Sequence, residues 1–204
     1  VEMSRAERRE RDAAAKAAKE LYASALASGI PYPVISVSDD GAKPTVVNTH
    51  AATTAKRVRL EWLPDDVDAL AALIQPLVAE GGNVAVIRNT VRRAQEAAEH
   101  LRNTLGPAVE VTVAHSHFLS VDRARKDRRL IETYGRDGAR PRGSVVVATQ
   151  VIEQSLDIDF DLMVSDLAPM DLLLQRIGRL HRHDRGERPS LVREPRLVIT
   201  AVDQ

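Results

Sequence analysis

The stretch "GGNVAVIRNTVRRAQEAAEHLRNTLGPAVEVTVAHS", residues 81–116, predicts a strand, a helix and a second strand in succession. Residues 83–89 form a short apolar run after two glycines, which is typical of a buried strand. Residues 90–105 are expected to form a helix, and residues 109–116 the second strand. Two strands joined through a helix make a βαβ unit, in which the strands run parallel.

The same alternation continues towards the end of the chain. It predicts helices at 120–134 and 169–180, and strands at 143–149, 160–166 and 194–202. Strands that alternate with helices of about 10 to 16 residues build a mostly parallel sheet with helices on both faces. The sequence therefore predicts an α/β fold.

The N-terminal part has a different pattern. Ser4 followed by Glu7 is a helix capping box, and the Ala-, Arg- and Lys-rich segment after it predicts a helix of about 24 residues that ends at Gly29. The apolar stripe of this helix is mostly alanine, so we expect weak packing, as in an arm or linker. The expected organisation is a helical arm or linker at 1–29 and one α/β domain at 30–204.

Two further strands are expected between the arm and the βαβ unit, at 30–37 and 56–63, with a loop between them. Pro31 and Pro33 favour a sheet edge for the first strand, because proline cannot donate to a strand ladder. Pro64 is expected to open a helix whose first turn carries several aspartates.

Composition sets limits on the class of protein. The chain has 204 residues, of which 44% are hydrophobic, enough for one large domain with an appendage. It has no cysteine, which rules out disulfides and thiolate metal sites and suits a reducing cytosol. The N-terminus is too charged for a signal peptide, and no apolar run approaches the roughly 18 residues of a membrane span. We therefore expect a soluble cytoplasmic protein with no membrane partner.

The stretch "QRIGRLHRH", residues 175–183, holds Arg176, Arg179 and Arg182 at a spacing of three. The whole chain is neutral, with 29 basic and 29 acidic residues, so net charge gives no argument for nucleic acid. Charge counts alone favour an exposed basic helix end over arginines that bind a phosphate. Gly178 is expected to loosen the helix and let the last two arginines diverge.

Several catalytic motifs are absent from the sequence. No glycine starts the pattern G-x-x-x-x-G-K-[ST], so the chain alone has no phosphate-binding loop for ATP and Mg²⁺. A G-x-S-x-G nucleophile elbow is also missing. The single tryptophan, Trp62, is expected in core or interface packing, because 3% aromatic residues provide no base-stacking platform.

Metal binding is not favoured. The pairs His115/His117 and His181/His183 have no cysteine or carboxylate at a matching short spacing for zinc. An acidic cluster that lacks the glycine-centred loop of an EF-hand follows the strand at 143–149 and consists of Glu153, Asp157, Asp159 and Asp161. We expect some of these acids to face solvent and others to pair with the downstream arginines. In particular, Arg176 is expected to neutralise Asp157, Asp159 or Asp161.

Polar residues follow the predicted strands, where open α/β sheets collect their chemistry. Asn89 and Thr90, His115 and Ser116, and Thr149 stand at these carboxyl ends. We also expect the loop after the helix at 169–180 to lie at this edge.

A family resemblance rests on the blocks "VVVATQVIEQSLDIDFD" at 145–161 and "MDLLLQRIGRLHRH" at 170–183, which resemble motifs V and VI of superfamily 2 helicases. Four sequence blocks resemble, in the same order, sequences of the helicase-nuclease family of type I CRISPR interference. These blocks are "AVIRNTVRRAQ" at 85–95, "HSHF" followed by "DRARKDRR", "ATQVIEQSLDID" at 148–159, and "QRIGRLHRH". Similarity extends upstream to "GIPYPVISV" and "VRLEWL". The resemblance implies a second RecA-like domain.

The resemblance also implies roles for individual residues. Arg179 and Arg182 would reach the γ-phosphate of an ATP, with its Mg²⁺, that is held mainly by the first RecA-like domain. Gln175 and Asp157 would contact the same nucleotide. The backbone of single-stranded DNA would be contacted by five residues at the strand ends, namely Asn89, Thr90, His115, Ser116 and Thr149. Arg179 and Arg182 would be the catalytic residues.

Three positions depart from the common helicase pattern. Ser155 and His181 stand where many superfamily 2 proteins have glycine, and both fit the usage of the CRISPR family. His117 stands where that family more often has arginine, which weakens the case for a phosphate contact there.

The function implied by the resemblance is that of one motor domain of an ATP-dependent, 3′ to 5′ DNA helicase with an HD-type nuclease domain, recruited by the CRISPR surveillance complex Cascade. The fragment alone is expected to be inactive. The alternatives are a helicase domain of a DNA-repair or RNA helicase, and a RecA-like protein-binding module without a motor role.

Overall fold

The computed structural model describes residues 4–27, 34–37, 45–48, 56–115, 120–153 and 156–201. Its contacts divide the chain into two compact units, Val1–Lys56 and Arg57–Gln204. The boundary predicted after Gly29 lies outside the described residues, so the division into an arm at 1–29 and a domain at 30–204 stays a prediction. No helix among the described residues is long and apolar enough to cross a membrane.

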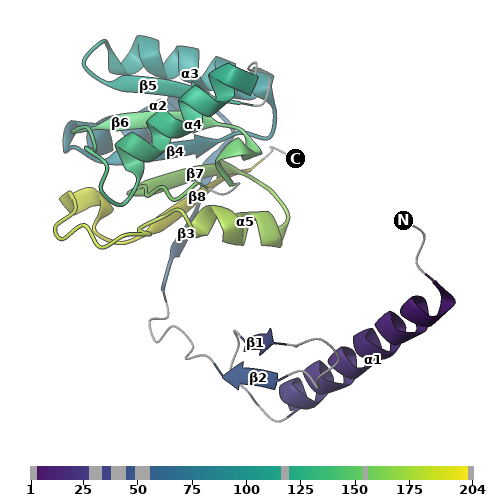
Figure 1. Cartoon of the computed structure of the whole chain (residues 1–204). Coiled ribbons are helices and arrows are strands. Elements are labelled where there is room, and N and C mark those ends of the chain that lie inside the picture. Colours follow the sequence, from purple (N-terminus) through teal and green to yellow (C-terminus); the bar gives the residue numbers. More distant parts are fainter. Residues whose placement is uncertain are drawn as a thin grey trace. The chain divides into compact units, whose positions relative to one another are not determined.

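The first unit contains helix α1 (Arg5–Ala27) and a hairpin of strands β1 (Val34–Val37) and β2 (Thr45–Asn48) (Figure 1). The predicted capping box is confirmed, because the Glu7 amide donates to Ser4 Oγ at 3.3 Å and the Ser4 amide donates to Glu7 Oε2 at 2.6 Å. Strand β2 was not predicted; its four residues fall within the segment expected to be a loop.

The second unit is a six-stranded sheet in the order β3-β8-β7-β4-β6-β5, and every neighbouring pair is parallel (Figure 1). The bounds of its strands are β3 (Arg59–Pro64), β4 (Asn83–Ile87), β5 (Glu110–Ala114), β6 (Ser144–Ala148), β7 (Leu162–Asp166) and β8 (Arg196–Ala201). Its helices are α2 (Val67–Ala79), α3 (Val91–Leu105), α4 (Ser120–Tyr134) and α5 (Met170–Ile177), with short 3₁₀ turns η1 (Gln150–Glu153) and η2 (Ser190–Val192). The predicted α/β fold is confirmed.

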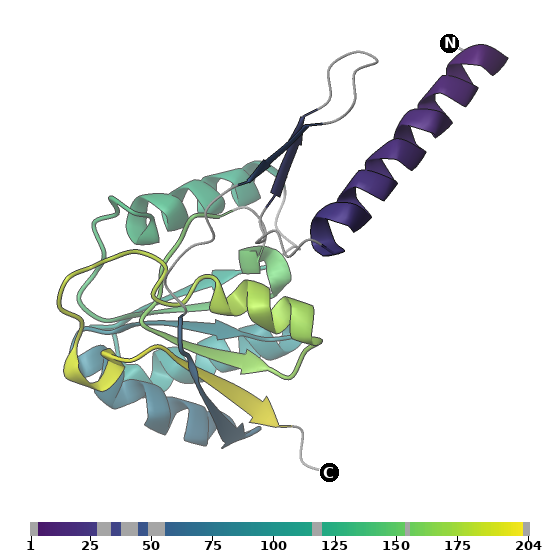
Figure 2. The same ribbon diagram turned by 90° about the horizontal axis from the view of Figure 1, so that it is seen from below.

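Helices cover both faces of this sheet (Figure 2). Side chains alternate along each strand, so Val84 and Val86 of β4 pack with α2 and α3, whereas Ala85 and Ile87 pack in the core beneath α4 and α5. All five residues of β4, β6 and β7 are buried, which accounts for the continuous apolar runs in the sequence. Trp62 on the edge strand β3 is 66% exposed, so it is not a core residue of this unit.

Helix α5 ends three residues earlier than predicted. Its last residue is Ile177, and Gly178 serves as the C-cap, donating its amide to the Leu174 carbonyl at 3.0 Å. Arg179, which was predicted inside the helix, and Arg182 therefore both lie beyond it, because Gly178 ends the helix that it was expected only to loosen. The helix at 67–79 also begins later than Pro64, because Pro64 completes β3 and Asp66 caps α2 through the Ala69 amide.

Candidate nucleotide and nucleic-acid site

The carboxyl ends of β4, β6 and β5 are neighbours in the sheet, so the residues that follow them lie along one edge. Asn89 and Thr90 follow β4, Thr149 follows β6, and His115 follows β5. Two backbone hydrogen bonds continue the strand pairing at this edge. The Arg88 amide donates to the Ala148 carbonyl at 2.8 Å, and the Thr149 amide donates to the Ala114 carbonyl at 3.1 Å. The structure thus brings four of the five predicted DNA contacts together. Ser116, and with it His117, lies outside the described residues.

These four residues differ in exposure. Asn89 and Thr90 are exposed, and Thr90 caps α3 by accepting a hydrogen bond from the Arg93 amide at 3.2 Å. Thr149 and His115 are buried, with 2% and 7% of their surface exposed. Among the described residues, the buried Oγ1 of Thr149 has no hydrogen-bond partner. Asn89 and Thr90 are therefore the accessible positions at this edge.

A buried carboxylate fixes the loop that carries Asn89. Asp166, at the end of β7, accepts hydrogen bonds from the Asn89 amide at 2.8 Å and from Arg88 Nη1 at 2.8 Å. Arg93 also donates to it at 3.0 and 3.1 Å, and the Thr200 hydroxyl donates at 2.8 Å. Burial raises the pKa of Asp166, but the hydrogen bonds outweigh it and bring the pKa to about 2. This network was not predicted from the sequence, although Asp166 stands at a predicted strand end.

Arg176 is buried and structural. Its Nε lies 2.7 Å from Glu153 Oε1, and its Nη1 donates to Ser165 Oγ at 2.6 Å and to the Asp166 carbonyl at 3.1 Å. Arg176 was expected to neutralise one of the aspartates at 157, 159 and 161. It does neutralise an acid of the segment 153–161, but that acid is Glu153. The turn η1 carries Glu153 beneath α5, whereas the aspartates lie further along the chain.

The loop with Arg179 and Arg182 does not lie at the edge of Asn89 and Thr149. Phe160, just before β7, forms a parallel bridge with Leu180, and its amide donates to the Arg179 carbonyl at 2.9 Å. Helix α5 starts after the carboxyl end of β7 and runs back along the sheet, so its C-terminal loop reaches the amino end of the same strand. The expectation that this loop lies at the carboxyl edge was wrong for its main chain, which lies beside Phe160.

Arg179 is a half-buried cation with few partners. Its Nη2 donates to the Glu153 carbonyl at 3.2 Å, and its buried Nε has no hydrogen-bond partner among the described residues. Burial lowers the pKa of the Arg179 guanidinium, and the positive charge of Arg182 lowers it further. An arginine nonetheless stays charged, so this guanidinium would be stabilised by an anion.

Arg182 and Asp157 form an exposed pair. The Arg182 Nε lies 2.5 Å from Asp157 Oδ1, and this hydrogen bond is the main cause of the lowered pKa of Asp157. Their side chains are 39% and 55% exposed. Gln175 is exposed on the last turn of α5. Arg179 feels the charges of both Arg182 and Asp157, and its side chain binds the carbonyl of Glu153, the residue whose carboxylate binds Arg176.

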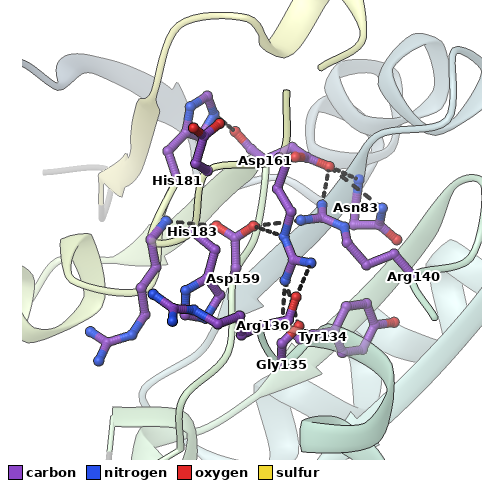
Figure 3. Close-up of polar contacts among 12 residues, drawn as sticks. Asn83, Tyr134, Gly135, Arg136, Arg140, Asp159, Asp161, His181 and His183 are labelled. Atoms are coloured by element: carbon purple, nitrogen blue, oxygen red, sulfur yellow. Dashed lines mark hydrogen bonds and ion pairs between the residues drawn. The ribbon is translucent and has the colours of Figure 1, made fainter. Parts of the chain in front are cut away.

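Asp159 and Asp161 are buried among arginines at the amino edge of the sheet (Figure 3). Arg140 donates to Asp159 at 2.5 Å and to Asp161 at 2.6 Å. Arg188 pairs with both carboxylates, and Arg185 pairs with Asp159 at 3.0 Å. The expectation is confirmed that some acids of this segment face solvent while others pair with downstream arginines, and Arg140 is an upstream partner in addition.

The described part of the chain contains no group of three or more His, Asp or Glu residues that could hold a metal ion. His181 Nε2 lies 2.9 Å from the Asp161 carbonyl, and burial lowers the pKa of His181. His183 lies 3.3 Å from Asp157. These two histidines are therefore part of the packing of the loop that follows α5 and carries Arg179 and Arg182, residues 178–185, which we call the arginine loop.

Comparisons with known proteins agree on one family. Residues 80–185 match the family described as the C-terminal part of the CRISPR-associated nuclease/helicase Cas3. The chain is similar to the CRISPR-associated nuclease/helicase Cas3 of Streptococcus thermophilus, with 41% identity over 152 residues, which is 74% of this chain and 16% of that protein. The chain thus spans about a sixth of the length of that relative.

Solved structures give the same result. The crystal structure of T. fusca Cas3 with ATP superposes with a TM-score of 0.72 at 35% identity, covering 86% of this chain and 22% of that one. A CRISPR RNA-guided surveillance complex in a pre-nicking state contains a chain that matches with a TM-score of 0.68 at 32% identity, covering 86% of this chain and 23% of that one.

Proposed function

The chain belongs to the C-terminal family of the CRISPR-associated nuclease/helicase Cas3, and from this premise we propose that it is the second RecA-like motor domain of an ATP-dependent DNA helicase. In the parent protein this domain would occupy residues 30–204, after the helical arm or linker at 1–29. It would supply motifs IV to VI, while the first RecA-like domain would supply the phosphate-binding loop and most of the ligands of ATP and Mg²⁺.

The half-buried guanidinium of Arg179 carries this proposal. It retains a buried Nε with no hydrogen-bond partner in the described part of the chain, and a second cation, Arg182, repels it more strongly than the carboxylate of Asp157 attracts it. An incoming γ-phosphate would relieve both conditions, because a guanidinium binds phosphate oxygens through parallel charge-assisted hydrogen bonds. Arg179 and Arg182 would then stabilise the charge that develops in phosphoryl transfer, which is the role of arginine fingers.

Arg182 would change partner during the cycle. Its Nε is held by Asp157 while the pair is exposed to solvent, where such a pair contributes little free energy. A phosphate with more negative charge can therefore compete for the guanidinium at small cost. Asp157 would then turn to the nucleotide, beside Gln175.

The DNA backbone would run along the carboxyl edge, across Asn89 and Thr90. Thr90 Oγ1 accepts the hydrogen bond that caps α3, and the same hydroxyl retains its proton for a phosphate oxygen. Thr149, His115 and Ser116 would line the neighbouring strand ends. Because the main chain of Arg179 and Leu180 lies at the amino end of β7, the sheet itself would connect ATP hydrolysis to the tracked strand. We propose 3′ to 5′ movement, as the family resemblance implies.

We further propose that the parent acts in the cytoplasm, carries an HD-type nuclease domain and works with the CRISPR surveillance complex Cascade. Two of the matching structures support nucleotide and complex binding in this family, since one is T. fusca Cas3 with ATP and the other is a CRISPR RNA-guided surveillance complex.

The test is the ATPase activity of the parent helicase with single-stranded DNA. Arg179→Ala and Arg182→Ala should each lower kcat by about 1,000-fold or more, the usual effect of an arginine finger, without weakening DNA binding. Arg59→Ala is the matched control, because Arg59 is 63% exposed in a surface pair with Glu194 on the edge strand β3. Normal hydrolysis in both finger variants would support a RecA-like module without a motor role.

A second measurement concerns the isolated chain. With no phosphate-binding loop in its sequence, this chain should show no DNA-stimulated ATPase above background. Substantial turnover by the chain alone would contradict the division of the site between two domains.

A further inference from the structure

Asp159 contacts the backbone of the proposed finger Arg182. Its side chain is fully buried, and its Oδ1 accepts a hydrogen bond from the Arg182 amide at 2.6 Å. This bond fixes the main chain at the residue whose side chain is proposed to reach the nucleotide. It joins residues that are 23 positions apart in the sequence.

The other oxygen of Asp159 connects this loop to helix α4. Oδ2 accepts from Arg185 Nε at 3.0 Å, and the same arginine donates to the carbonyls of Arg136 at 2.6 Å and of Gly135 at 2.5 Å, just beyond α4. The Asp159 amide itself donates to the carbonyl of Tyr134, the last residue of α4, at 3.0 Å. The arginine loop is thus attached to a rigid helix end through one carboxylate.

Arginines outnumber the carboxylates around Asp159. Arg140 and Arg188 each reach both Asp159 and Asp161, so two buried carboxylates face three guanidinium groups when Arg185 is included (Figure 3). Burial raises the pKa of Asp159, but Arg188, Arg185 and Arg140 outweigh it and hold the pKa below its ordinary value. Asp159 is therefore ionised at neutral pH, when its hydrogen bond to the amide is strongest.

We propose that Asp159 is a positioning residue for ATP hydrolysis, which holds the segment Arg179–Arg182 in the geometry that a γ-phosphate requires. This inference rests on the proposed function of the two arginines. Displacing a catalytic group by about 1 Å can lower the rate by 100-fold. Loss of the hydrogen bond between Asp159 and the Arg182 amide should therefore lower kcat.

Asp161 provides a matched control within the same cluster. It is as buried as Asp159 and pairs with the same Arg140 and Arg188. Its carboxylate, however, accepts from the amide of Asn83, in β4, at 2.7 Å, whereas the Arg182 amide donates to Asp159. Removing either carboxylate removes one buried charge, but only the change at Asp159 releases Arg182.

The experiment compares Asp159→Ala, Asp159→Asn and Asp161→Ala in the parent helicase, using variants that remain folded at the assay temperature. Asp159→Ala should lower kcat for DNA-stimulated ATP hydrolysis by about 100-fold. KM for ATP and affinity for single-stranded DNA should stay near wild type, because the first domain and the opposite sheet edge would supply those contacts. Asp161→Ala should retain most of kcat.

Asp159→Asn keeps an oxygen for the Arg182 amide but loses the charge, so it should recover part of the activity lost in Asp159→Ala. Equal kcat values for the Asp159→Ala and Asp161→Ala variants would overturn the inference. If Asp159→Ala does not fold, Asp159→Asn is compared with Asp161→Asn, and equal kcat values again overturn it. Should Arg179→Ala and Arg182→Ala both keep full activity, the proposed function itself fails; if only the Asp159 variants stay active, the positioning role alone fails.

Discussion

Replacing Arg176 with methionine tests whether the first arginine of "QRIGRLHRH" is a structural residue. Its side chain is 2% exposed, and that of its partner Glu153 is 5% exposed. The change removes three hydrogen bonds at once, to Glu153, to the Ser165 hydroxyl and to the Asp166 carbonyl. It leaves Glu153 as a buried carboxylate without its counter-charge.

The expected cost follows from this burial. Breaking a buried ion pair by removing one partner destabilises a protein by about 3–5 kcal/mol, because the remaining charge stays desolvated. The corresponding cost for Arg182→Ala is about 0–1 kcal/mol, since its pair with Asp157 is exposed and screened by solvent. Adding Glu153→Gln to Arg176→Met should recover about 2 kcal/mol, because it removes the uncompensated charge.

The assay is urea unfolding of the 204-residue chain, followed by far-ultraviolet circular dichroism, for wild type, the two single variants Arg176→Met and Arg182→Ala, and the double variant Arg176→Met/Glu153→Gln. The reasoning is refuted if Arg176→Met costs no more than Arg182→Ala. It is also refuted if Glu153→Gln makes Arg176→Met less stable rather than more stable.

Three further predictions concern other parts of the sheet. The pKa of Asp166 is about 2, below its ordinary 3.8, so its ionised form stabilises the fold above pH 4. This contribution of about 2 kcal/mol to the free energy of unfolding should be lost as the pH falls from 4 to 2. An Asp166→Asn variant should lack that pH dependence. Gly143→Ala should destabilise by more than Gly186→Ala in thermal unfolding, because both have positive φ but only at Gly143 would the new Cβ lie 2.2 Å from a carbonyl oxygen, that of Val78. Thr90→Ala should cost about 1 kcal/mol in urea unfolding through the lost cap of α3 and should also weaken binding of single-stranded DNA, whereas Thr90→Ser should preserve both; an equally unstable Thr90→Ser would contradict the capping role.

The fold was largely predictable from local patterns. Apolar runs of β-branched residues, such as 144–148, and helical segments, such as 120–134, lie within a few residues of the observed elements. Strand β2 was missed because "TVVN" is only four residues long, which is too short for a periodicity to be recognised. The early end of α5 was foreseeable in kind, because Gly178 weakens a helix, but its last residue was set by the cap.

The sequence by itself determined the α/β architecture, the strand ends that carry Asn89 and Thr149, and the place of Arg182 beyond the helix before it. These features depend on residues near one another in the chain, through periodicity, capping and spacing.

Only the tertiary structure decided which acid each arginine meets and at which edge of the sheet it lies. Arg176 meets Glu153, 23 residues away, and Arg140 meets Asp159 across 19 residues. Such pairings depend on how η1 turns and on α5 running back to the amino end of β7. The physical reason is that a buried charge is stable only beside its counter-charge, and that partner is chosen by packing in space rather than by distance along the chain.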